Sequence, residues 1–163
     1  MKRARKKPGF TLIELIVVLV IMAILAAAAI PTMMGYVEKA KGAQHVAEAR
    51  IIYVAATAAY TEAYGVYGQT PTMASVQFAP DSLHAEPTDA RSLIEKRVYE
   101  MCIAGIPMQP GEKSAEAFIT GTAAGSVTKV EYHTSFLLDD SHRWYVTIEI
   151  GPGGENTATW EKR

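Results

Sequence analysis

Apolar residues dominate the start of the chain, from Phe10 to Val37. The only polar residues in this stretch are Thr11, Glu14 and Thr32. About 20 apolar residues suffice for a helix to cross a bilayer core, and this stretch has 28. Five cations precede it, namely Lys2, Arg3, Arg5, Lys6 and Lys7. Because positive flanks stay on the cytoplasmic side, we expect residues 10–37 to span a membrane with the N-terminus inside the cell.

A second pattern begins at Val46, where apolar or small residues recur every three or four positions. They are Val46, Ala49, Tyr53, Ala56, Tyr60 and Ala63. This spacing places them on one side of a helix, so residues 38–65 are predicted to be amphipathic and to pack against the rest of the chain. A helix from Phe10 to Tyr64 would be roughly 80 Å long. Pro31 lies inside it, removes one backbone hydrogen bond and predicts a kink, and Gly35 loosens the same region.

The remaining residues, 66–163, divide into two parts. Prolines interrupt residues 66–126 and predict irregular loops there, around one helix that begins after Thr88 or Asp89 and ends near Ala104. On that helix four residues share the predicted buried face: Ile94, Val98, Met101 and Cys102. We therefore expect Cys102 to be a small buried hydrophobe rather than a reactive thiol.

Residues 127–161 alternate between apolar and polar positions, which is typical of a sheet with one buried face. The predicted inward residues are Val130, Tyr132, Phe136, Leu138, Trp144, Val146, Ile148, Ile150, Ala158 and Trp160. Residues 139–142 and 151–154 are the predicted turns, and residues 117–120 add an edge strand. The predicted fold class is α+β: a long N-terminal helix packed on an antiparallel meander of three to four strands.

Residues that could carry catalysis or bind a metal are few outside the apolar stretch. The four histidines, His45, His84, His133 and His142, lack metal-ligand spacing, and the sequence has no phosphate loop or nucleophile motif. Asp139 and Asp140 are weak calcium candidates, although adjacent carboxylates in a turn are usually solvated. We therefore expect a non-enzymatic protein without a cofactor.

A carboxylate inside an apolar span is costly and calls for a functional explanation. Glu14 ends the stretch Lys7-Pro8-Gly9-Phe10-Thr11-Leu12-Ile13-Glu14, which resembles the prepilin motif of the type IV pilin and pseudopilin family. The resemblance implies that residues 1–9 are a cytoplasmic leader, which a prepilin peptidase removes by cutting between Gly9 and Phe10 before it methylates the new Phe10 amine.

The resemblance also implies an assembly mechanism. Glu14 of an incoming subunit would pair with the Phe10 amine of a subunit already in the filament, and Pro31 and Gly35 would form a hinge that can lose helicity. The implied partners are further copies of this chain, an assembly ATPase, an inner-membrane platform protein and the membrane itself before assembly. The expected final location is a cell-surface filament used in adhesion, twitching motility or secretion.

Other functions stay open at this point. The chain could be a pseudopilin of a type II secretion system, or a minor rather than a major pilin. In a different class, it could be a membrane-anchored or secreted ligand-binding domain, released by cleavage near the alanines at 26–29. Loss of residues 1–9 lowers Lys and Arg from 16 to 11 against 17 Asp and Glu, giving −6. That charge disfavours nucleic acid as a partner.

Overall fold

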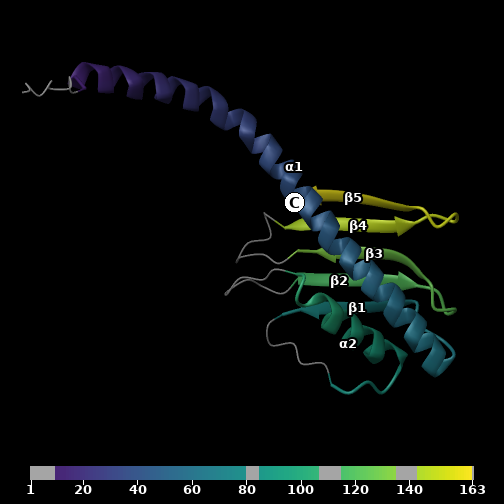
Figure 1. The fold of residues 1–163 in the computed structure, drawn as a ribbon. Coiled ribbons are helices and arrows are strands. Elements are labelled where there is room, and N and C mark those ends of the chain that lie inside the picture. The colour runs from purple at the N-terminus through teal and green to yellow at the C-terminus, as the bar shows by residue number, and fades with distance from the viewer. Residues whose placement is uncertain (1–9, 80–84, 107–114, 135–142, 163) are drawn as a thin grey trace, which may run out of the picture. The chain divides into compact units, whose positions relative to one another are not determined.

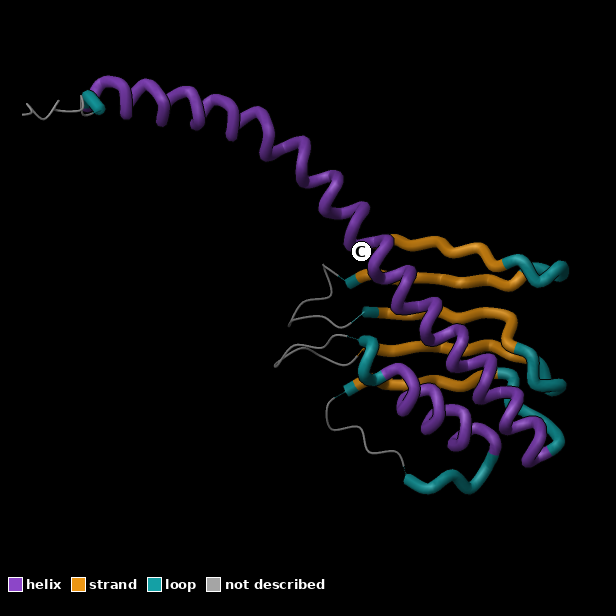
Figure 2. Tube along the Cα trace, in the orientation of Figure 1, coloured by secondary structure: helices purple, strands orange, loops and turns teal. Residues whose placement is uncertain are grey.

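The computed structural model describes residues 10–79, 85–106, 115–134 and 143–162. It divides into two compact units, Met1–Ala40 and Lys41–Arg163. One helix, α1 (Leu12–Tyr67), contributes to both (Figures 1 and 2). The other elements belong to the second unit, which is the head of the molecule.

The first unit consists of the apolar half of α1. Its large apolar side chains, from Phe10 to Val37, are each 45–84% exposed. The helical assignment continues without interruption through Pro31 and Gly35. Because the helix is apolar around its whole circumference, its sequence favours no single face for packing against another element.

The head contains five strands: β1 (Met73–Phe78), β2 (Ala115–Gly121), β3 (Val127–His133), β4 (Trp144–Ile150) and β5 (Asn156–Lys162). They pair antiparallel in the order β1-β2-β3-β4-β5, which is a meander with α2 (Ala90–Cys102) inserted between β1 and β2. The second half of α1 and the shorter α2 lie on one face of the sheet (Figure 1). The predicted α+β class is confirmed.

The predicted strand count of three to four was too low. β1 lies in the part expected to be irregular, and residues 117–120 belong to β2, which pairs on both sides and is not an edge strand. β1 was missed because it is short and has Pro71 just before it and Pro80 just after it. Its burial nevertheless alternates strictly, with Ala74, Val76 and Phe78 inside.

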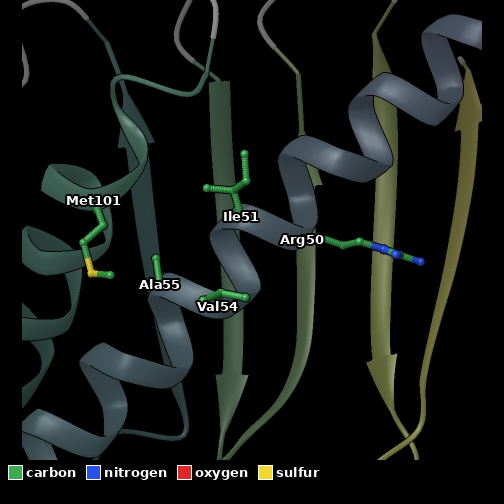
Figure 3. A pocket seen from close by; sticks show the side chains of 5 residues that line it. All are labelled: Arg50, Ile51, Val54, Ala55 and Met101. Atoms are coloured by element: carbon green, nitrogen blue, oxygen red, sulfur yellow. The ribbon is translucent and has the colours of Figure 1, made fainter.

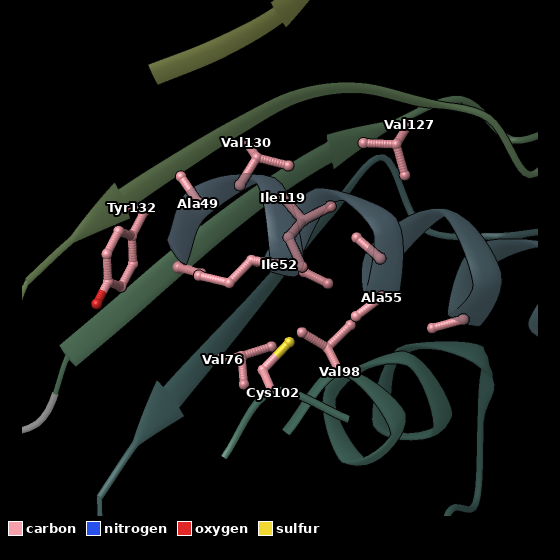
Figure 4. Close-up of a cluster of buried hydrophobic side chains, with 14 of the residues drawn as sticks. Ala49, Ile52, Ala55, Val76, Val98, Cys102, Ile119, Val127, Val130 and Tyr132 are labelled. Atoms are coloured by element: carbon pink, nitrogen blue, oxygen red, sulfur yellow. The ribbon is translucent and has the colours of Figure 1, made fainter. Parts of the chain in front are cut away.

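The core lies between the helices and the sheet. Figure 4 shows Ile52 of α1 among side chains that come from the strands and from α2. The α1 surface that faces the sheet is largely alanine: Ala49, Ala55, Ala56, Ala59 and Ala63 are all buried. The Tyr60 ring of α1 fills the space beside Gly121 and leaves no room there for a Cβ atom.

Most predicted inward positions are confirmed. Val130, Tyr132, Trp144, Val146 and Ile148 are buried, whereas Ile150 and Ala158 are only partly buried. Phe136 and Leu138 lie outside the described residues.

Three details differ from the predictions. Trp160 is 42% exposed although it lies on the helix-facing side of β5. On α2, Ile94, Val98 and Cys102 are buried as predicted, but Met101 is 51% exposed, because it points off the buried face of the helix. Asp89 caps α2 by accepting a hydrogen bond from the Ser92 amide, and the helix ends two residues before the predicted Ala104.

Candidate functional site

The candidate site begins at the first turn of α1. Thr11 precedes the helix, and Glu14 is the third residue within it. The Thr11 amide and the Thr11 hydroxyl donate hydrogen bonds to Glu14 Oε2, at 2.8 and 2.7 Å. In return, the Glu14 amide donates to Thr11 Oγ1 at 3.3 Å. This reciprocal arrangement is a capping box, which satisfies backbone donors that the start of a helix leaves free.

The capping box was missed in the sequence, although its signal is present there. A threonine followed three positions later by a glutamate, immediately before an apolar run, is the pattern of this motif. Glu14 therefore has a local structural use as well as the assembly role that the resemblance implies. Among the described residues, only Oε2 of its carboxylate accepts hydrogen bonds and Oε1 accepts none.

The other residues implied by the resemblance are placed in part. Phe10 directly precedes the capping box and is 84% exposed. Gly9, the other side of the expected cleavage site, lies outside the described residues. Cleavage between them would convert the Phe10 nitrogen to an amine and leave the Thr11 amide unchanged. The capping box can therefore persist after the leader is removed.

The candidate hinge residues lie within continuous helix. A Cβ atom at Gly35 would have no neighbour within 4 Å. Next to Pro31, the Thr32 hydroxyl donates to the Ala29 carbonyl oxygen at 2.8 Å, so this polar side chain is satisfied within the apolar segment. The hinge stays a prediction.

The apolar half of α1 carries most of the exposed large hydrophobic side chains of the described residues. By length and composition, α1 is long and apolar enough to cross a membrane. The core helix of a soluble protein and an N-terminal signal sequence pass the same test, and the absence of buried residues in this stretch argues only against the first. Exposed apolar surface of this extent indicates contact with lipid or with other protein chains.

The described residues of the head offer little that resembles a catalytic site. Among the described residues, no three His, Cys, Asp or Glu side chains group closely enough to hold a metal ion. Asp139 and Asp140, the weak calcium candidates, lie outside the described residues. A shallow apolar depression of about 340 Å³ is lined by Met101 of α2 and by four residues of α1 (Figure 3): Arg50, Ile51, Val54 and Ala55. It contains no convergent polar groups.

A polar cluster is buried between α1 and β3. Glu48 is 5% exposed, and its Oε2 lies 2.9 Å from His45 Nδ1. Tyr132 donates its hydroxyl to the same oxygen at 3.2 Å, and Gln44 donates to Oε1 at 3.0 Å. Burial acts to raise the pKa of Glu48, but these hydrogen bonds and the nearby His45 outweigh it and lower the pKa. The cluster ties α1 to β3 and is a structural feature of the head.

Comparisons with known proteins bear on the N-terminal part of the chain. Residues 4–30 match the model of the prokaryotic N-terminal methylation motif. No curated protein and no solved structure matches the chain. The matched stretch includes Phe10, the capping box and most of the apolar half of α1, and it leaves the head outside.

Proposed function

We propose that this chain, which carries the prepilin motif of type IV pilins and pseudopilins, is a structural subunit of a type IV pilus or a related filament. The observation that carries the proposal is the match of residues 4–30 to the methylation motif. The motif family is structural rather than enzymatic. The exposed apolar half of α1 supplies the surface through which subunits would polymerise.

The proposed sequence of events starts in the membrane. The precursor is inserted with its N-terminus in the cytoplasm, and a prepilin peptidase cuts between Gly9 and Phe10 and methylates the Phe10 amine. The mature subunit then waits in the bilayer as a single-span protein. An assembly ATPase and a platform protein extract it into a surface filament. Extraction is feasible because the apolar helices leave lipid only to pack on one another, so their surface stays away from water.

Glu14 would serve two purposes in this mechanism. Its Oε2 holds the capping box of its own helix, and its Oε1 is available to accept a hydrogen bond from the Phe10 amine of a neighbouring subunit. Both charges are costly in a low-dielectric filament core, and pairing them offsets part of that cost. The pair would set the register between subunits. Since each subunit offers an acid to one neighbour and an amine to another, the contact is heterologous and produces an open helical polymer.

The first test is the intact mass and the N-terminal residue of the protein in a fraction sheared from the cell surface. We expect a chain that begins at methylated Phe10 and is recovered in sedimentable fibres. A chain that begins near Ile30 in the soluble medium would contradict the proposal and indicate a secreted domain.

The second test separates the two roles of Glu14. Glu14→Gln keeps a side chain that can complete a capping box but removes the charge, whereas Thr11→Ala removes the cap and keeps the charge. We expect Glu14→Gln to abolish or severely reduce filaments and Thr11→Ala to retain most of them, with processing intact in both. Thr11→Ser, which preserves the cap, is the matched control. Normal filament yield from Glu14→Gln would show that the charge is not required for assembly.

A further inference from the structure

Trp160 of β5 is a large aromatic side chain that the head leaves partly uncovered. It is 42% exposed, while Trp144 on the neighbouring strand is 6% exposed. The two rings lie 5.0 Å apart between centroids. The Trp160 ring also lies directly on Gly42 of α1, where an added Cβ atom would come within 2.6 Å of Trp160 Cε2. The ring is therefore held in a defined place on the helix.

Charged residues of both signs lie near this aromatic pair, and Glu161 stands between Trp160 and Lys162 in β5. The Lys162 ammonium lies 5.9 Å from the centroid of the Trp144 ring, near the end of β5. Lys41, which directly precedes Gly42, is exposed. Tryptophan is enriched at both membrane–water interfaces, where its ring lies among the headgroups.

The position of Gly42 along the chain brings this patch close to lipid. Val37 is the last residue of the apolar segment, and Gly42 follows five residues later. Five residues of helix rise about 7.5 Å, and even a fully extended link would span at most about 18 Å. The headgroup region on each side of a bilayer is about 5–8 Å thick. When residues 10–37 span the membrane, this short link keeps Gly42 and the ring that covers it within reach of the outer headgroups.

We propose that Trp160 docks the head on the outer lipid headgroup surface while the subunit is held in the membrane before assembly. The inference rests on the membrane stage of the proposed function. A lipid surface is the favoured occupant because the patch is joined to the span by a short link, which gives it a high effective concentration at that surface. A second copy of the chain would have to reach the patch by diffusion.

The test uses the full chain in vesicles of phosphatidylcholine and phosphatidylglycerol at a low ratio of protein to lipid. Part of the phosphatidylcholine carries bromine, which quenches tryptophan on contact, either near the glycerol end or near the methyl end of its acyl chains. Trp144→Phe leaves Trp160 as the single tryptophan, because the chain has two. We expect this variant to lose fluorescence with bromine near the glycerol end and much less with bromine near the methyl end.

Trp160→Phe, which leaves only the buried Trp144, is the matched control and is expected to be quenched little by either lipid. If Trp144→Phe disturbs the head, the difference in quenching between the unaltered chain and Trp160→Phe gives the same information.

Flotation of the vesicles separates the two proposals. A chain that does not float with lipid contradicts the membrane stage itself. A chain that floats while Trp160 stays unquenched, whether free or covered by a second copy, overturns only the docking of the head.

Discussion

The two halves of α1 have the same backbone conformation but different surroundings. In the first half, the large apolar side chains from Phe10 to Val37 are each 45–84% exposed, whereas in the second half Ile52 and Tyr60 are completely buried. The second half concentrates its buried residues on one stripe, which one sheet face and α2 together cover. The first half is apolar on all sides and needs an environment that surrounds it, such as lipid or other helices. The distribution of apolar residues around the helix, rather than their number, separates the part that folds with the head from the part that does not.

The largest expected effect follows from removing the first half. A chain that begins at Lys41 keeps all the buried residues of α1 and loses the exposed apolar segment. We expect it to be soluble and folded without detergent, while the full chain requires detergent or lipid. Circular dichroism and gel filtration check this prediction. Aggregation of the shortened chain would mean that the first half contributes to the stability of the head.

The next prediction compares glycines of the two regions. At Gly121 in β2, a Cβ atom would meet the Tyr60 ring and would lie 2.9 Å from the Ser126 carbonyl oxygen, whereas at Gly35 it would meet nothing within 4 Å. Overpacking of this kind typically costs about 1–3 kcal/mol. We expect Gly121→Ala to lower the free energy of unfolding of the head by about that amount and Gly35→Ala to leave it unchanged.

Denaturant unfolding in detergent, followed by tryptophan fluorescence, measures this effect, because both tryptophans are in the head. Equal midpoints for Gly121→Ala and the unaltered chain would show that the helix and sheet can separate slightly at no cost.

Much of this fold could be predicted from pattern alone. The alternation in β3 and β4 and the stripe on α1 have the periods that burial on one face imposes, and both were identified. β1 was missed because short strands between prolines carry little local signal, and its pairing with β2 is a contact between distant residues. The exposure of Trp160 and Met101 depends on where β5 and α2 lie in three dimensions, and periodicity does not specify that.

The candidate site shows a different limit. The motif around Phe10 and Glu14 was identifiable by resemblance, but the capping box that Glu14 forms with Thr11 was missed although its pattern is local. Conversely, the cluster around Glu48 joins residues 84 positions apart in the sequence, so no local pattern could predict it.

A smaller effect is expected from that buried cluster. Because the pKa of Glu48 is lowered in the folded head, its ionised form stabilises the fold above the ordinary glutamate pKa of about 4.3, and this stabilisation is lost as the pH falls through the lowered value. Glu48→Gln should therefore cost about 1–3 kcal/mol near pH 5 and clearly less near pH 3. The difference in unfolding free energy between the two proteins at each pH is the measurement. A difference that does not change with pH would contradict the proposed contribution of the charge.

The smallest effect concerns reactivity rather than stability. Cys102 is completely buried, and burial raises the pKa of its thiol to about 12, far above the usual 8.5 or so. Since the thiolate is the reactive form, we expect maleimide labelling of the native protein at pH 7 to be slower than that of the unfolded protein by at least about a thousandfold.

The matched control moves the thiol by one position, in a chain with both Cys102→Ser and Met101→Cys. Met101 is 51% exposed, so a thiol there should be labelled rapidly in the native state. If native Cys102 reacted as fast as this control, α2 would have to separate from the sheet readily. The head would then be less tightly packed than the complete burial of the residues on α1 that face the core indicates.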